Sequence, residues 1–225
     1  MEVRRLTTGV VRSKRAESGL RRYLPGGWSA ETAPVSAYLV EHPDGRCLFD
    51  VGQTARATHP GYLPRWHPYL RLARFEVEPS DEVAAQVDPW SVSRVVLSHL
   101  HTDHVGGLAP FRNAEVFVSR TEWERARGLA GRLRGYVPQH WPAGLEPHLV
   151  DVDGPAVGPF AASYDLAGDG RLLLVPTPGH TPGHLGMIVR GERDGGWLLA
   201  GDAKIVDDVR AFCASEGLVV LGAHD

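Results

Sequence analysis

The chain has 225 residues, of which 43% are hydrophobic, and its formal net charge is −3 at pH 7. This length allows a sizeable buried core, so we expect a single domain over residues 1–225. The charge gives no general attraction to nucleic acid, and no apolar run reaches the roughly 18 residues that a membrane-spanning helix needs. Cys47 and Cys213 stand at unrelated positions, so we expect both to be apolar packing residues rather than partners in a disulfide. The first residues lack a signal-peptide core, so we expect a cytoplasmic protein.

Strand-like and helix-like segments follow one another along the chain. The apolar segments 35–40 and 46–50 flank the turn His42-Pro43-Asp44-Gly45, which predicts a β-hairpin. The later patterns predict a helix over 80–87, a strand over 94–98, a helix beginning at Thr121 with Glu124 in a capping box, strands over 172–175 and 197–202, a helix over 203–214 and a strand from 218.

The segment His99-Leu100-His101-Thr102-Asp103-His104, directly after the strand at 94–98, contains four potential metal ligands in six residues. In an extended segment side chains two apart share a face, so His99 and His101 can bind one metal together. Asp103 and His104 diverge where the chain turns, which suits a second metal close to the first. Imidazole and carboxylate are ligands of zinc and similar divalent ions. The alternative is a solvated loop that happens to be rich in histidine.

A second histidine pair, His180 and His184, follows the strand at 172–175. Pro178 and Pro182 exclude a helix here, so we expect only one of the pair to bind metal. His180 is nearer to the preceding strand and is our choice. We expect His184 to be a hydrogen-bonded supporting or core residue.

Two further strands end on polar residues. The strand at 197–202 ends on Asp202, whose two oxygens allow it to bridge two cations; capping of the following helix is the equal alternative. The last strand leads to His224, one residue before the end of the sequence.

The order of these groups resembles the metallo-β-lactamase-fold hydrolase superfamily, from about Pro34 onwards. The segments 101–107, 177–184 and 201–203 are similar to the branch that contains the N-acyl-homoserine lactonases. Two features differ from that branch. Ile205 stands where those lactonases usually have a tyrosine, and the segment from Asp202 to His224 is shorter than in those relatives.

The resemblance implies an α/β fold, a four-layer αβ/βα sandwich with two metals at one edge on strand-end loops. A weak similarity between residues 47–52 and 198–202 also fits a sandwich of two αβ units. The implied cofactors are two divalent cations, zinc first, with manganese, cobalt or iron as alternatives. The implied ligands are His99, His101 and His180 for one metal, Asp103, His104 and His224 for the other, and Asp202 for both.

In this superfamily the residue matching Asp103 also orients the metal-bridging hydroxide and shuttles its proton. We therefore expect a metal-dependent hydrolase that cleaves a small ester or lactone, similar to an N-acyl-homoserine lactone. A phosphodiesterase or phosphatase, a mononuclear iron dioxygenase, and a degenerate non-catalytic relative are the alternatives. The expected partner is a small-molecule substrate, without nucleic acid or membrane, and the oligomeric state is open, a homodimer being one option. Aromatic residues gather at 23–28, 60–70 and 136–141, where they line a substrate pocket or simply pack as loops.

Overall fold

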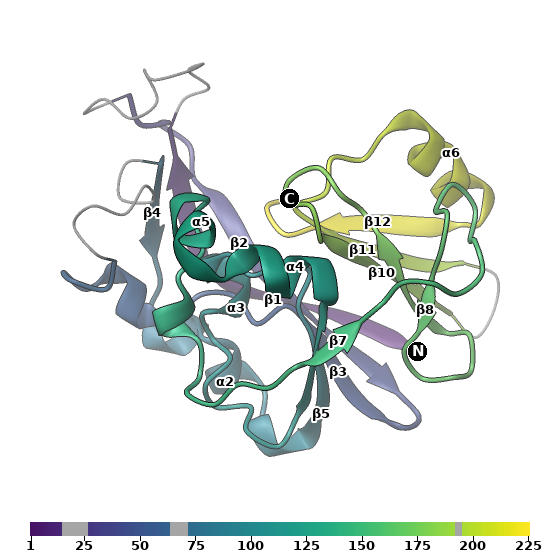
Figure 1. Cartoon of the computed structure of the whole chain (residues 1–225), viewed down its shortest axis with the longest axis horizontal. Helices are drawn as coiled ribbons and strands as arrows, with labels where there is room; N and C mark the ends of the chain where they lie inside the picture. Colours follow the sequence, from purple (N-terminus) through teal and green to yellow (C-terminus); the bar gives the residue numbers. More distant parts are fainter. Residues whose placement is uncertain (15–26, 64–71, 192–194) are drawn as a thin grey trace.

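Two stacked β-sheets form the centre of the protein. The computed structural model describes residues 1–14, 27–63, 72–191 and 195–225. One sheet has seven strands in the order β4-β1-β2-β3-β5-β6-β7, and the other has five in the order β12-β11-β10-β9-β8 (Figure 1). The expected aromatic segments at 23–28 and 60–70 lie largely outside the described residues.

The strands of the seven-stranded sheet are β1 Glu2–Ser13, β2 Ala33–His42, β3 Gly45–Phe49, β4 Ala73–Glu76, β5 Val92–Val96, β6 Glu115–Ser119 and β7 His148–Val150. Those of the five-stranded sheet are β8 Tyr164–Asp165, β9 Leu172–Pro176, β10 Leu185–Arg190, β11 Gly196–Gly201 and β12 Leu218–Gly222. The α-helices are α2 Val83–Gln86, α3 Thr102–Val105, α4 Arg120–Ala126, α5 Gly128–Leu133 and α6 Asp207–Ser215, and short 3-10 turns occur at Ala55–Thr58, Pro79–Asp81, Pro89–Ser91 and Pro138–His140. Among the described helices, none combines the length and apolarity needed to cross a bilayer.

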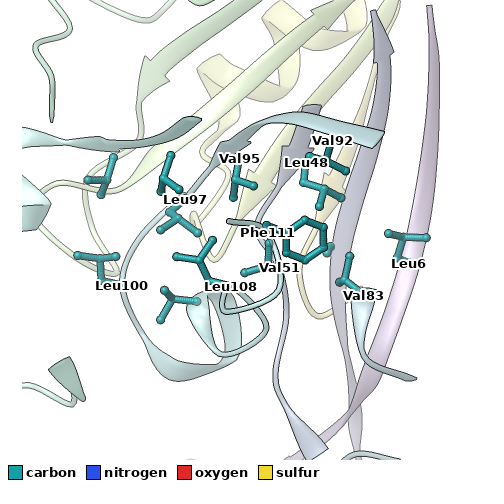
Figure 2. Packing of buried hydrophobic residues seen from close by; sticks show 14 of the residues in the cluster. Leu6, Leu48, Val51, Val83, Val92, Val95, Leu97, Leu100, Leu108 and Phe111 are labelled. Atoms are coloured by element: carbon teal, nitrogen blue, oxygen red, sulfur yellow. The ribbon is translucent and has the colours of Figure 1, made fainter. Parts of the chain in front are cut away.

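Alternating side chains divide the core into layers. In β5, Val95 belongs to an apolar cluster that includes residues of α2, α3 and α4, while its neighbour Val96 belongs to the cluster between the two sheets. Figure 2 shows residues of the first of these layers, among them Leu48, Val83 and Leu100. A further apolar layer lies between the five-stranded sheet and α6, on the other side of the sandwich (Figure 1). The expected four-layer αβ/βα sandwich is therefore confirmed.

Strand direction explains why distant polar residues meet. The strands β3, β5 and β6 are parallel, so their carboxyl ends, and with them Asp50, His99 and Ser119, lie at one edge of the sheet. In the other sheet β11 and β12 are parallel, and β9 has the same direction because both β9 and β11 are antiparallel to β10. The carboxyl ends of these strands therefore meet the first edge.

The hairpin was predicted correctly, with His42 opposite Gly45 at its end. The predicted helix over 80–87 is instead a 3-10 turn followed by α2, interrupted at Glu82, which has an extended backbone. The carboxylate of Glu82 accepts hydrogen bonds from Ala55 N and Thr54 Oγ1, at 2.8 and 3.0 Å. This tertiary contact outweighs the local helical pattern.

Two helix starts were also predicted wrongly. Helix α4 begins at Arg120, because Ser119 Oγ accepts a hydrogen bond from Glu122 N at 3.0 Å and caps the helix two residues before the expected Thr121. Helix α6 begins at Asp207 after Val206, so Asp202 does not cap it.

Both cysteines are free and buried, as the sequence predicted. Burial raises the pKa of the Cys47 thiol to about 12, and burial also raises the pKa of Cys213. We expect neither thiol of the folded protein to react with Ellman's reagent at pH 8, because the thiolate is the reactive form. Both should react once guanidinium chloride unfolds the chain. Rapid labelling of one thiol without denaturant would contradict this packing.

Candidate metal centre

All seven residues predicted from the sequence lie together where the two sheets meet. They form three overlapping groups whose potential ligand atoms lie within 4.8 Å of one another: His99, His101 and His180; His99, His104 and Asp202; Asp103, His104 and His224. Each residue follows a strand end or begins the short helix α3. The fold thus brings together residues that are far apart in the sequence.

The first group consists of three imidazoles. His101 Nδ1 lies 3.0 Å from His99 Nε2 and 3.0 Å from His180 Nε2. His99 and His101 are buried, whereas the side chain of His180 is 36% exposed. Three ring nitrogens that converge in this way provide the lone pairs that a divalent cation such as zinc accepts.

Asp202 lies between the first group and the second, which consists of Asp103, His104 and His224. Asp202 Oδ2 is 3.4 Å from His180 Nε2, while Oδ1 is 3.4 Å from His104 Nε2 and 3.3 Å from His224 Nε2. Asp103 Oδ2 is 3.7 Å from His224 Nε2. The two oxygens of Asp202 therefore face different groups, as a carboxylate shared by two cations requires.

Three buried polar atoms of this cluster have no hydrogen-bond partner among the described residues. They are Asp103 Oδ1, His104 Nε2 and Asp202 Oδ1. Such atoms are costly to bury unless something else pairs with them. Divalent cations would pair with all three, so the side chains present fit a two-metal site.

The outer nitrogens of the histidines are held by other groups. His104 Nδ1 donates to Asp50 Oδ2 at 2.8 Å, and His224 Nδ1 donates to the carbonyl of Pro34 at 2.7 Å. Ser98 Oγ donates to Asp50 Oδ2 at 2.8 Å and is 3.1 Å from His99 Nδ1. Partners of this kind fix the ring orientation and leave Nε2 facing the centre of the cluster.

His184 is a supporting residue, as expected from the sequence. Its Nδ1 is 2.8 Å from Thr177 Oγ1, and its Nε2 accepts a hydrogen bond from Asp202 N at 3.2 Å. Burial lowers the pKa of His184 to about 3, so the ring is neutral and both nitrogens are occupied. A Cβ on Gly201 would lie 3.0 Å from this ring, so the backbone approaches it closely at that point.

The ionisation of the cluster follows from burial and from the carboxylates. Burial lowers the pKa of His101 to about 3, and burial followed by the neighbouring imidazoles lowers the pKa of His99 well below its usual value. Burial opposes the charged form of His104 too, but Asp202 and Asp50 outweigh it and raise its pKa. His104 and its neighbours in turn outweigh burial at Asp202 and lower the pKa of that carboxyl.

Asp50 is a site residue that the sequence analysis did not identify. It is 1% exposed, has a φ of 60°, and accepts hydrogen bonds from Ser98 N, Ser98 Oγ and His104. Its signal was present, because the strand 46–50 ends on a carboxylate as the strand leading to Asp202 does.

The surroundings of the site combine polar and apolar side chains. A cavity of about 320 Å³ is lined by His180, Asp202, His224, Ile205 and Val220, among others. Next to Asp103, the Tyr62 hydroxyl is 3.0 Å from Thr102 Oγ1. The Tyr62 ring stacks on His140 with the ring centroids 3.8 Å apart, so two of the expected aromatic loops meet here.

This fold and this cluster define a protein of the metallo-β-lactamase class. Residues 30–211 match the family described as the Metallo-beta-lactamase superfamily, and the chain belongs to it. It is similar to N-acyl homoserine lactonase AttM of Azorhizobium caulinodans, with 35% identity over 185 residues, 78% of this chain and 66% of the relative. N-acyl homoserine lactonase AiiA of Bacillus thuringiensis subsp. kurstaki is 29% identical over 186 residues, 76% of this chain and 64% of the relative. The chain thus spans about two thirds of the length of these relatives.

Solved structures share the fold. An N-acyl homoserine lactone hydrolase with N-hexanoyl-L-homoserine bound at its catalytic metal center has a TM-score of 0.70 at 19% identity, covering 99% of this chain and 92% of that one. The dizinc quorum-quenching lactonase AidC has a TM-score of 0.61 at 15% identity, covering 99% and 86%.

The role of Asp50 leads to a prediction. In Asp50→Asn, the side-chain NH2 group would face the N–H of His104 Nδ1, so two donors would meet. We expect the ring proton to move to Nε2, the nitrogen that faces the cluster. We expect zinc affinity to fall about 10- to 100-fold, measured by competition with a chromogenic chelator. Asparagine tolerates a positive φ, so the fold should persist. The exposed Asp44→Asn is the matched control, and equal affinity in both variants would contradict the assignment.

Proposed function

We propose that the protein is a two-metal hydrolase that opens a small neutral lactone or ester, an N-acyl-homoserine lactone or a close analogue. The observation that carries this proposal is the position of Asp202, whose two oxygens face two separate groups of histidines. The similarity to N-acyl homoserine lactonases over 78% of the chain supports the same class of substrate.

We assign His99, His101 and His180 to the first metal, Asp103, His104 and His224 to the second, and Asp202 to both. Divalent cations held by these residues would lower the pKa of a bound water towards about 7 and would polarise the scissile carbonyl. Zinc is the first candidate, since the donors are imidazole nitrogens and carboxylate oxygens.

Asp103 is our candidate for the group that moves the proton. It is 7% exposed, its Oδ1 has no hydrogen-bond partner among the described residues, and its Oδ2 faces His224. In hydrolysis a water oxygen bonds to the acyl carbon, the ring C–O bond breaks, and the released alkoxide takes up a proton. Asp103 accepts the proton that the water loses and returns it to the alkoxide.

The cavity favours a neutral substrate over a phosphate ester. Its lining includes Asp202 and Asp225 but neither lysine nor arginine among the described residues, whereas a phosphate site usually presents such cations. Ile205 and Val220 give it an apolar wall that suits a short acyl chain. A phosphodiesterase is the second candidate, and no described residue of the cavity lining favours it.

A substrate panel tests the proposed activity. We expect the zinc-loaded protein to hydrolyse N-acyl-homoserine lactones at least about tenfold faster than bis-p-nitrophenyl phosphate, measured as acid release at pH 7.5. His101→Ala should lose about two orders of magnitude or more, because it removes a ligand of the first metal. The exposed His148→Ala should retain activity. Hydrolysis that is unaffected by His101→Ala, or phosphodiester cleavage alone, would overturn the proposal.

The shared position of Asp202 gives a second test. We expect Asp202→Ala to weaken the binding of both metals, while Asp207→Ala at the exposed start of α6 retains them. The metal content of both variants is measured by plasma mass spectrometry after gel filtration. Retention of two full equivalents by Asp202→Ala would remove its bridging role.

A further inference from the structure

The first turn of α4 contacts both loops that carry the first histidine group. Leu100, between His99 and His101, donates its backbone N–H to Glu122 Oε1 at 3.1 Å. Ser119 Oγ donates to the carbonyl of Gly183, three residues after His180, at 2.6 Å. Two side chains on one helical turn thus bind two loops from different sheets.

The loop that contains Gly183 packs closely against the first turn of α4. A Cβ on Gly183 would lie 2.2 Å from Glu122 N and 2.6 Å from Ser119 Oγ, so only glycine fits between the loop and the helix. Ser119 Oγ also accepts the N–H of Glu122 at 3.0 Å, which links the two contacts to each other. The side chain of Leu100 is anchored in the apolar layer of Figure 2. The loop at 99–101 is therefore fixed from two directions.

Glu122 itself is an unusual residue for this position. Its relative exposure is 0%, and no lysine or arginine of the described residues forms an ion pair with it. Burying a carboxyl group costs free energy that an apolar side chain would avoid, unless hydrogen bonds offset that cost. Burial and the Glu122 carboxylate together raise the pKa of Tyr136, and the Tyr136 ring is 5.0 Å from the His101 ring. The carboxyl group therefore lies beside the loop at 99–101, where it accepts the Leu100 N–H.

We propose that Ser119 and Glu122 are positioning residues that set the distance between His180 and the pair His99 and His101. We call these two residues the α4 bracket. This inference rests on the proposed function, because it assumes that the first histidine group binds a metal. The second group is held by Asp50 and by the carbonyl of Pro34 instead, so the bracket acts on the first metal alone.

Zinc and cobalt binding to metal-free protein tests the bracket in two backgrounds. His224→Ala leaves the first group complete, and His180→Ala leaves the second. In the first background we expect Glu122→Met to weaken binding about 10- to 100-fold, measured by chelator competition and by the cobalt d–d spectrum. Glu122→Gln should stay within about threefold of its parent, because its carbonyl still accepts the Leu100 N–H. In the His180→Ala background all variants should match their parent within about threefold.

The exposed Glu124→Gln, on the same helix, is the matched control and should change nothing. Ser119→Ala supplies an independent test, since it removes the contact with Gly183, and we expect it to weaken the first group about tenfold. This variant decides the matter if circular dichroism shows that Glu122→Met does not fold.

Several results would overturn the bracket. One is that Glu122→Met or Ser119→Ala binds metal as tightly as its parent. Another is that Glu122→Gln loses as much affinity as Glu122→Met. The third is that the variants lose equal affinity in both backgrounds. A wild-type protein that binds neither zinc nor cobalt would instead remove the proposed function, and the bracket with it. The two failures are therefore distinguishable.

Discussion

Converging lone pairs of imidazole nitrogens and carboxylate oxygens require positive charge between them, and the candidate metal centre is built around this requirement. His99, His101 and His180 turn nitrogens toward one another, and Asp202 lies between them and the second group. Burial of oxygens and nitrogens that lack hydrogen-bond partners among the described residues costs free energy. Asp202 and Asp50 outweigh burial and raise the pKa of His104. Two cations would satisfy the same atoms and leave the imidazoles neutral.

The fold makes this arrangement possible by placing strand ends rather than strand faces at the site. Parallel neighbours in both sheets end at the same edge, so side chains that follow different strands meet there. Apolar layers pack behind that edge. Beyond the potential ligands, Asp50 and Ser98 contact the rings of His104 and His99. Glu122 and Ser119 contact the backbone of the two loops that carry the first histidine group.

The sandwich and the convergence of the candidate ligands could be predicted because short local segments carry the resemblance to the metallo-β-lactamase-fold superfamily. A buried strand followed at once by His or Asp is visible in a single segment, as at His99 and Asp202. Asp50 was missed although its strand also ends on a carboxylate, because its contact with His104 spans 54 residues. Glu122 looked like an ordinary residue of a helix start, although its carboxylate accepts the N–H of Leu100 in another loop. The interruption at Glu82 likewise follows from a tertiary contact, since its carboxylate accepts hydrogen bonds from Thr54 and Ala55.

Counting the metal ions tests the central claim most directly. The protein should be purified without chelators, stripped of metal, dialysed against zinc, freed of excess ion by gel filtration and measured by plasma mass spectrometry. Close to two equivalents of zinc per chain is the result that the two groups and the shared Asp202 predict. No retained metal, or a single equivalent of iron in the protein as purified with no second site for zinc, would contradict the two-metal account.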